Sequence, residues 1–473
     1  MYRLIDDYLS RWKDDKYRKP LVVQGARQVG KTYAVLEFGK KHYDNVAYFN
    51  FQTSPTLGKT FDEDLRPEYL LPILSHICGQ TITKGRTLIV FDEIQLCERA
   101  LTSLKYFCEE APEYHVIAAG SLLGVAVNRE KYAFPVGKVD RYTMYPMNME
   151  EFLLALGEQD LVTRIKTCYK DHTPMPVALH ETGLKLYRQY LVIGGMPEAV
   201  ARYVETKDYT QVRHVQETIQ MDYLDDMSKY QDNANEIKKT RLAYGTIAVQ
   251  LSKKNTRFQY KLIKKGARAA EFENAIQWLV TANLVHKVYR AEQIMKPLDN
   301  YKDIDDFKIF LSDMGILCAQ KDIRPDDVFF MEEELAEFKG GMIENYVDNQ
   351  LTMNGLRTYF WRNEKGTKEI DFIVSLDGNF FERSISCVLQ NLDPGNRIGN
   401  LRFVGINLPK PCQDSVFQRL TVGTLHELSI LCCKLIVFRD HNNAEHEQNC
   451  QHNQHRQQQI LRVNPEPFEN AKQ

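Results

Sequence analysis

The stretch GARQVGKT, residues 25–32, matches the pattern G-x-x-x-x-G-K-[ST] at every defined position. A short apolar run at residues 21–23 precedes it, and a helical pattern from Lys31 to about His42 follows it. In this setting, glycines allow backbone N–H groups to converge on phosphate oxygens, and the helix N-terminus adds a favourable dipole. The stretch therefore predicts a phosphate-binding loop formed by Gly25, Ala26, Arg27, Gln28, Val29, Gly30, Lys31 and Thr32.

Two side chains of this loop have a chemistry of their own. We expect the Lys31 ammonium to reach the β and γ phosphates of a nucleotide and to act in catalysis. The Thr32 hydroxyl is expected to bind Mg²⁺. The loop therefore predicts ATP and Mg²⁺ as the cofactors of the chain.

A second element supports this interpretation. Residues 88–91 are all apolar, and Asp92 and Glu93 follow them directly. Asp92, at the end of a buried strand, would bind Mg²⁺ directly or through water, and Glu93 would polarise the attacking water. Thr32 and Asp92 are therefore the predicted metal ligands, and Glu93 is a predicted catalytic residue.

A third apolar strand, residues 114–119, leads into Gly120 and Ser121. We expect this strand to lie between the strand that ends in the two acids and the strand that precedes the loop. Ser121 would then contact the γ phosphate or the water as a further catalytic residue. Capping of a following helix by the Ser121 hydroxyl explains the residue type equally well.

Strand and helix patterns alternate along this part of the chain, which predicts an α/β fold with a parallel sheet. The strand patterns cover residues 21–23, 46–51, 87–91 and 114–119, and the helical patterns cover residues 1–20, 31–42, 70–82 and 100–109.

Several segments resemble, in order, the family of prokaryotic AAA-type ATPases that carry a C-terminal domain of unknown function. They are GARQVGKT at 25–32, LIVFDEIQ at 88–95, AAGSLLG at 118–124, YPMNMEEFL at 145–153, GGMPEAV at 194–200, FQYKLIKKGARAAEFENAIQWL at 258–279, FKIFLSDMGIL at 307–317 and EIDFIV at 369–374. The resemblance implies an AAA-type P-loop core with the site residues in the roles given above. It also implies a C-terminal region that combines a winged-helix-like part with an α/β fold like that of restriction endonucleases.

This resemblance, with the helical patterns, predicts five parts of the chain. They are an AAA-type core at 1–150, a helical lid or linker at 151–230, a winged-helix-like section at 231–330, a partial endonuclease-like domain at 331–385 and an atypical, partly disordered tail at 386–473. The glycines and proline of Gly194-Gly195-Met196-Pro197 predict a tight turn between helices.

AAA-type ATPases often need an arginine at the γ phosphate, from the same or a neighbouring subunit. The family shows Gly-Arg before the segment at 145–153, where this chain has Gly137-Lys138. Lysine lacks the bidentate fork of arginine. Arg141 or Arg129 could substitute as the catalytic arginine, although a surface ion pair would explain either one. The resemblance also leaves a homo-oligomer open.

A basic segment at 252–268 stands out in a chain that has 61 Lys and Arg against 63 Asp and Glu. It contains Lys253, Lys254, Arg257, Lys261, Lys264, Lys265 and Arg268 and no acid. A basic winged-helix unit could contact DNA phosphates through these side chains. A solvated face, or a contact with an acidic segment such as 331–337, would explain the charges as well.

In the C-terminal part, Glu344 and the pair Glu369 and Asp371 resemble the beginning of a metal-dependent nuclease site. The following strand lacks the Glu-x-Lys that completes such a site. We therefore expect a structural role, in which Trp361-Arg362 pairs with Asp371 and holds the fold together.

From about Glu382 onward nothing resembles the family. Half of residues 440–473 are Asn, Gln or His, and half of all cysteines lie at or beyond Cys387. Our hypothesis is that a frame change in the coding sequence has replaced the end of the domain. A lineage-specific tail is the alternative.

No apolar stretch is long enough to span a membrane, and the charged start lacks the apolar core of a signal peptide. We therefore expect a cytoplasmic protein with no membrane association. The motifs together predict an ATPase that couples Mg²⁺-dependent ATP hydrolysis to a conformational change of its C-terminal domains. The alternative is a nucleotide-dependent switch or scaffold that recruits a protein partner with little turnover.

Overall fold

The computed structural model describes residues 1–121, 134–171, 173–229, 231, 233–253, 257–329, 336–364, 369–376 and 379–383. All of them belong to the first of the two units into which the chain divides, Met1–Ile436. Arg129, Lys254 and the predicted tail lie outside the described residues. Within the described part, no helix is both long and apolar enough to cross a membrane.

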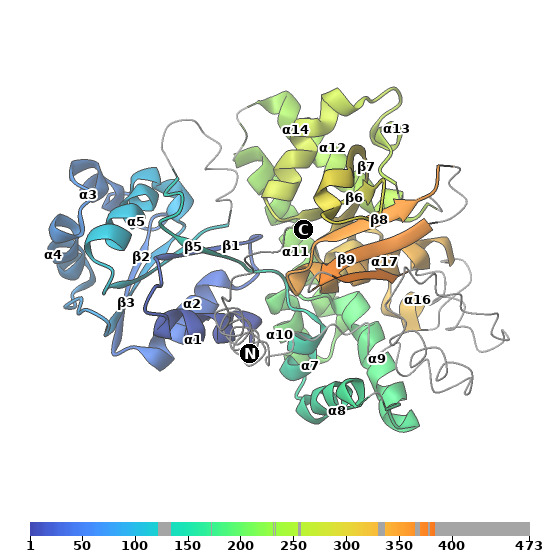
Figure 1. The fold of residues 1–473 in the computed structure, drawn as a ribbon, viewed down its shortest axis with the longest axis horizontal. Helices are drawn as coiled ribbons and strands as arrows, with labels where there is room; N and C mark the ends of the chain where they lie inside the picture. The colour runs from blue at the N-terminus through green and yellow to red at the C-terminus, as the bar shows by residue number, and fades with distance from the viewer. Residues whose placement is uncertain are drawn as a thin grey trace, which may run out of the picture. The chain divides into compact units, whose positions relative to one another are not determined.

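The first part of the chain forms a five-stranded sheet in the order β2-β3-β4-β1-β5 (Figure 1). The strands are β1 (Leu21–Gln24), β2 (Asn45–Asn50), β3 (Thr87–Asp92), β4 (His115–Ala119) and β5 (Asp140–Thr143). Every neighbouring pair is parallel. The prediction of a parallel α/β core is therefore confirmed, and β4 lies between β3 and β1 as expected.

Helices cover both faces of this sheet. They are α1 (Leu4–Asp14), α2 (Lys31–His42), α3 (Leu57–Glu63), α4 (Pro67–Cys78) and α5 (Glu98–Glu110). The last three pack with Phe49 and Phe91 in one apolar cluster and, in Figure 1, lie on the side away from α1 and α2. Helix α2 packs closely on the other face, because a Cβ at Gly39 would lie 2.6 Å from the Val46 side chain. Since both faces are covered, β3 and β4 are buried along their whole lengths.

The next section is helical, as predicted. It contains α7 (Met149–Ala155), α8 (Gln159–Lys170), α9 (Val177–Ile193), α10 (Pro197–Thr206) and α11 (Tyr209–Lys229). The short 3₁₀ turn η1 (Ile94–Leu96) belongs to the first part, where it follows β3. The side chain of Asn148 caps α7 by accepting a hydrogen bond from the Glu151 N–H.

The turn between α9 and α10 brings three segments into close contact. Gly194 has a φ of +75°, and a Cβ at Gly195 would lie 2.0 Å from the Met147 carbonyl oxygen. The Gly195 N–H donates to the Asp313 carboxylate at 2.6 Å. Burial raises the pKa of Asp313 to about 6, against backbone hydrogen bonds that lower it. The glycines are therefore required by packing, as the tight-turn interpretation predicted.

Three helices and an antiparallel hairpin follow. They are α12 (Ala234–Leu251), α13 (Tyr260–Ile263), α14 (Ala269–Thr281), β6 (Val285–Ala291) and β7 (Lys302–Leu311), with the 3₁₀ turn η2 (Leu298–Tyr301) in the hairpin loop. Between α12 and α13, Arg257 forms an isolated antiparallel bridge with Lys308 of β7. The winged-helix-like character of this section stays a prediction.

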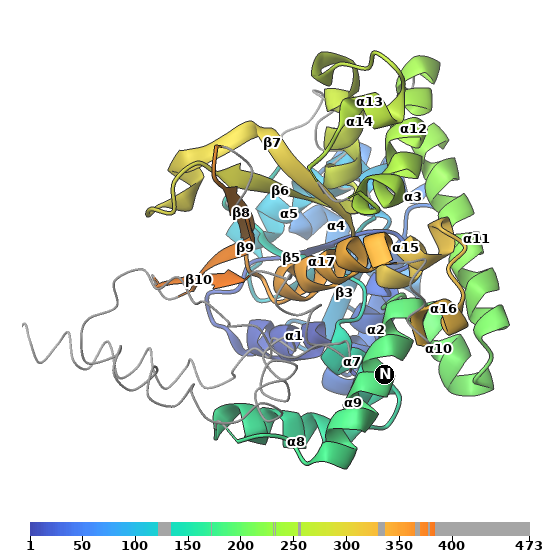
Figure 2. The ribbon, with the colours of Figure 1, turned by 90° about the vertical axis from the view of Figure 1, so that its right-hand side faces the viewer.

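The hairpin continues into a second five-stranded sheet in the order β10-β9-β8-β6-β7 (Figure 2). The added elements are α15 (Met314–Gln320), α16 (Pro325–Phe329), α17 (Ala336–Met353), β8 (Thr358–Arg362), β9 (Glu369–Leu376) and β10 (Asn379–Arg383). Strands β6 and β8 are parallel and the other pairs antiparallel. The expected boundary at residue 330 thus separates strands that share one sheet.

A buried lysine organises the acids of this region. Lys308 is 1% exposed, and its Nζ lies 2.9 Å from Glu344 Oε2, 2.7 Å from Glu369 Oε1 and 3.6 Å from Asp371 Oδ1. Burial alone would lower the pKa of Lys308, but the three carboxylates raise it. In the described part of the chain, no group of three or more His, Cys, Asp or Glu side chains could hold a metal ion.

The predicted pairing of Arg362 with Asp371 is wrong. Arg362 donates to Asp306 at 2.5 Å, and the cation beside Asp371 is Lys308. The reason is the sheet order, because β7, β6 and β8 bring their charged side chains together across strands that are distant in sequence.

Replacing Lys308 by Met would remove the buried cation that contacts Glu344, Glu369 and Asp371. We expect the free energy of unfolding to fall by about 3–5 kcal/mol, measured by urea denaturation. Arg357→Met is the matched control, because its ion pair with Asp299 is exposed and contributes little. Equal stability of the two variants would contradict the structural role of Lys308.

Candidate active site

The loop between β1 and α2 has a backbone that requires its glycines. Gly25 has a φ of +143° and Gly30 a φ of +89°, in the range that other residues rarely adopt. A Cβ at Gly25 would also lie 2.0 Å from the Met144 carbonyl oxygen. Gln28 shares the left-handed conformation, with a φ of 67°. The loop is thus folded tightly against the chain segment that follows β5.

Lys31 is buried at the first position of α2 and is 8% exposed. Its Nζ donates to the carbonyl oxygens of Gly25 at 3.1 Å and Ala26 at 2.6 Å. Burial lowers the pKa of Lys31 to about 8, while the charges of Glu93 and Asp92 oppose this shift. A buried ammonium whose acceptors are neutral carbonyls suits an anionic ligand, so the donor set fits a phosphate group.

Thr32 and Asp92 form the second part of the site. The Thr32 hydroxyl lies 3.1 Å from each carboxylate oxygen of Asp92, which is 4% exposed at the end of β3. Asp92 also accepts hydrogen bonds from the Tyr48 hydroxyl at 2.6 Å and the Asn50 amide at 3.2 Å. A hydroxyl beside a fixed carboxylate is an oxygen donor set that fits Mg²⁺.

Glu93 has a left-handed backbone, with a φ of 52°. Such a conformation is unfavourable for glutamate and is often found at functional sites. The Glu93 N–H donates to Asp92 at 3.0 Å, and the Gln95 side-chain amide donates to the Glu93 carboxylate. The left-handed backbone at Glu93 therefore points the Glu93 and Asp92 side chains in different directions, and the hydrogen bond from Gln95 restrains the Glu93 carboxylate.

Ser121 follows β4 and is 7% exposed. Its neighbour Gly120 donates from its N–H to the Val23 carbonyl oxygen at 3.2 Å. Because parallel strands end at the same edge of a sheet, Ser121 lies at the edge where β1 and β3 end. Its role in catalysis stays a prediction.

The structure does not bring Arg141 to the loop. Arg141 pairs with Val22 in the middle of β5, and its guanidinium lies 3.8 Å from the Phe134 ring centroid. Lys138, in the position where the family has arginine, forms an ion pair with Glu109 at 2.9 Å. The described contacts of both cations are therefore with groups outside the loop.

Sequence reasoning missed the contacts that α11 makes with the loop. The Arg27 guanidinium donates to Asp226 at 2.5 Å, and the Gln28 amide donates to Asp222. The Tyr223 hydroxyl donates to the Arg27 carbonyl oxygen at 3.2 Å. Only the fold could reveal these contacts, because they join residues almost two hundred positions apart.

Arg3 holds the loop from another direction. It is 6% exposed and donates to the carbonyl oxygens of Val29 at 2.8 Å and Tyr145 at 2.7 Å. It also forms a buried ion pair with Glu151 at 2.9 Å. The loop is therefore tied to α1, to the segment after β5 and to α7.

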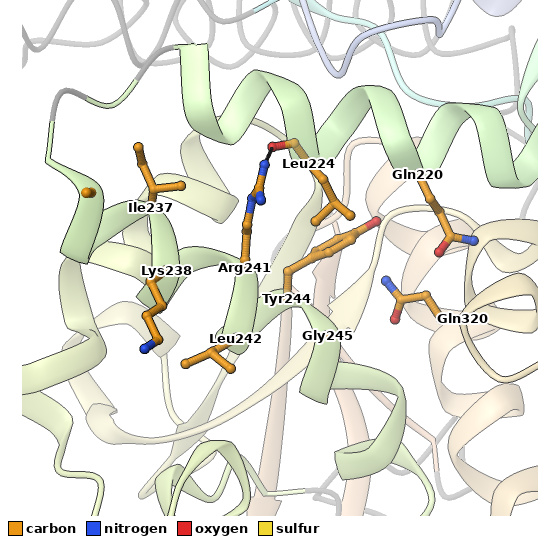
Figure 3. Close-up of a pocket in the computed structure, with 10 residues that line it drawn as sticks. Gln220, Leu224, Ile237, Lys238, Arg241, Leu242, Tyr244, Gly245 and Gln320 are labelled. Atoms are coloured by element: carbon orange, nitrogen blue, oxygen red, sulfur yellow. Dashed lines mark hydrogen bonds between the residues drawn. The ribbon is translucent and has the colours of Figure 1, made fainter.

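A cavity of about 670 Å³ lies on the other side of α11 (Figure 3). It is lined by Gln220, Leu224, Ala234, Ile237, Lys238, Arg241, Leu242, Tyr244, Gly245 and Gln320. Residues two apart on a helix point in nearly opposite directions, so Gln220 and Leu224 face away from Asp222 and Asp226. This cavity is therefore separate from the phosphate-binding loop.

Two family models match the chain. Residues 17–153 match the model described as an AAA domain, and residues 184–327 match a domain of unknown function, DUF8612. The first match covers the parallel sheet with its loop and both acids. The fold of the first part of the chain is that of a P-loop α/β core, and its residues 17–153 are similar to an AAA domain.

The solved structures that match the chain share little sequence with it. A Walker-type ATPase of Pyrococcus abyssi is 13% identical, covers 67% of this chain and 94% of its own, and has a TM-score of 0.40. The ORC2 protein of Aeropyrum pernix, in ADPNP and ADP complexes, is 12% identical, covers 70% and 95%, and has a TM-score of 0.38. The ORC1 protein of Aeropyrum pernix in complex with DNA is 11% identical, covers 67% and 90%, and has a TM-score of 0.26. With TM-scores this low, no property of these proteins is transferred to the chain. No curated protein matches the sequence.

The lowered pKa of Lys31 leads to a pH prediction. Only the protonated amine holds phosphate, so the affinity for ATP should fall as the pH rises through about 8, by up to about tenfold per pH unit. Lys31→Arg stays charged and should show no such fall. A fluorescent-nucleotide titration measures this, and an affinity of the wild-type protein that stays constant to about pH 9.5 would contradict the lowered pKa.

Proposed function

We propose that the chain binds ATP with Mg²⁺ at this loop and catalyses its hydrolysis. One observation carries the proposal: the buried Lys31 stands beside a Thr32 hydroxyl that lies 3.1 Å from both oxygens of Asp92. Three groups with separate tasks in phosphoryl transfer are thus brought together from α2 and β3.

Each group has a defined task in this proposal. The backbone N–H groups of residues 25–32 and the Lys31 ammonium bind the phosphates. Thr32 and Asp92 would hold Mg²⁺, which would neutralise charge on the phosphate oxygens. Glu93 accepts a proton from the attacking water, and Ser121 contacts the γ phosphate or that water.

A nucleotide-dependent switch remains the competing proposal. In that case ATP binding alone would change the C-terminal part and recruit a protein partner, with little turnover. The contacts of α11 with the loop support both proposals, because α11 connects the loop to the following helices. Turnover is therefore the property that separates them.

Steady-state phosphate release tests the proposal. We expect Glu93→Gln to lower kcat by about 10²–10⁴-fold while nucleotide affinity is kept, because the base is lost and the loop is not. Lys31→Ala should lose both binding and turnover. If the wild-type rate equals that of Glu93→Gln while both bind ATP, the chain is a switch and not an ATPase.

A second proposal is that the section with α12, α13 and α14 contacts DNA phosphates. The supporting observation is that Lys261, Lys265 and Arg268 are exposed around α13 and the start of α14. Two cations of the basic segment have acidic partners, because Arg257 pairs with Asp306 at 3.0 Å and Lys264 lies 3.5 Å from Glu271. Lys253 at the end of α12 adds another exposed charge.

DNA binding would be electrostatic, so it should weaken steeply with salt. We expect the double variant Lys265→Ala with Arg268→Ala to reduce both the affinity for duplex DNA and the slope of log affinity against log salt, by fluorescence anisotropy. Lys59→Ala, an exposed lysine of α3, is the control. Failure of the wild-type protein to bind at low salt would refute this proposal.

A further inference from the structure

Arg27 is the cation of the loop that the proposed ATPase mechanism does not use. Its side chain is 39% exposed, and its Nη1 lies 2.5 Å from Asp226 Oδ1 of α11. Burial lowers the pKa of Arg27, and the charges of Asp226, Asp222 and Glu93 together raise it above its ordinary value. The guanidinium also contributes to the lowered pKa of Lys31. The charge of Arg27 therefore interacts with both Glu93 and Lys31 of the candidate active site.

We propose that Arg27 exchanges Asp226 for the γ phosphate of bound ATP, so that it senses the γ phosphate and releases α11. This inference rests on the proposed function, because it needs a nucleotide at the loop. It assigns the γ-phosphate arginine to Arg27 within the loop, whereas Arg141 contacts the ring of Phe134 and Arg129 lies outside the described residues.

The chemistry of the two acceptors makes such an exchange feasible. Guanidinium binds both carboxylate and phosphate through paired N–H donors, and the γ phosphate offers more charge than one carboxylate. Because the Arg3 guanidinium donates to the Val29 carbonyl oxygen at 2.8 Å, the loop backbone is also held by a residue outside α11. The side chain can therefore change partner while the loop keeps its shape.

Asp226 would be affected most by the exchange. It is 5% exposed, and burial raises the pKa of Asp226 while Arg27 opposes this shift. A buried carboxylate that loses its cation is strongly disfavoured. Asp226 would have to reach water or take up a proton, and either change weakens the contact between α11 and the loop.

Helix α11 is in a position to pass this change onward. The Arg241 guanidinium of α12 donates to the Leu224 carbonyl oxygen at 2.8 Å (Figure 3). It also donates to the Ser228 hydroxyl at 2.6 Å. The Gln216 amide donates to the Val192 carbonyl oxygen at 2.9 Å. A displacement of α11 would therefore reach both α12 and the end of α9.

Equilibrium binding of ADP and of ATPγS, each with Mg²⁺, tests the proposal without measuring turnover. Arg27→Ala should weaken ATPγS binding by about tenfold or more and change ADP binding by less than about twofold. Asp226→Asn should tighten the binding of ATPγS but not that of ADP, because it removes the carboxylate charge that competes with the γ phosphate for Arg27. Arg66→Ala is the control, since Arg66 also forms an ion pair with an aspartate, Asp64, but lies outside the loop.

Hydrogen exchange of residues 209–229 gives a second readout. In the wild-type protein, ATPγS should lower the protection of α11 relative to ADP, and in Arg27→Ala the two nucleotides should give equal protection. Arg27→Lys keeps the charge but lacks the paired N–H donors of arginine, so it controls for misfolding. Its difference in protection between ATPγS and ADP should lie between those of the wild-type protein and Arg27→Ala. Equal weakening of ADP and ATPγS by Arg27→Ala, or no weakening of either, would overturn the exchange. If the wild-type protein binds neither nucleotide, the proposed function fails together with this inference.

Discussion

The contact between the Thr32 hydroxyl and the Asp92 carboxylate is the constraint on which the rest of the site depends. It joins the first turn of α2 to the end of β3, across sixty residues of sequence. The Asp92 carboxylate also accepts hydrogen bonds from the Tyr48 hydroxyl, the Asn50 amide and the Glu93 N–H. One carboxylate therefore sets the position of the hydroxyl, the direction of the next acid and the alignment of β2 with β3.

The same loop is also where the core meets the helical section. The segment after β5 is held by the Met144 N–H, which donates to the Gln24 carbonyl oxygen at 2.7 Å, and by the Met147 N–H, which donates to the Gly195 carbonyl oxygen at 2.6 Å. Because packed elements shift between discrete arrangements, a conformational change at the loop can reach the helical section only through the elements that contact the loop. Helix α11 and the turn at Gly194-Gly195 are two such routes.

Much of the core could be predicted from sequence, because its signals are local. Four apolar strands, a glycine-rich loop and a pair of acids each occupy a few consecutive residues. Strand β5 was missed because Asp140–Thr143 is short and polar, and it forms only by pairing with β1. Three parts of the site, Tyr48, Gln95 and the contacts of α11, could not be predicted, because they depend on strand register and helix packing.

The C-terminal part illustrates the same limit. Sequence reasoning looked for a lysine on the strand after Asp371, whereas the cation beside the acids is Lys308 of an earlier strand. Pairing of β6 with both β7 and β8 places that strand there, and no spacing rule within the segment indicates it. Local patterns thus identify candidate acids, and the fold decides which charges they meet.

The most direct test of the central claim is a calorimetric titration of ATP into the wild-type and Asp92→Asn proteins, with Mg²⁺ and with EDTA. If Thr32 and Asp92 hold the metal of a nucleotide site, Mg²⁺ should tighten ATP binding in the wild-type protein by about tenfold or more, and the gain should disappear in Asp92→Asn. The same gain in both proteins, or no binding of ATP to the wild-type protein, would contradict the account.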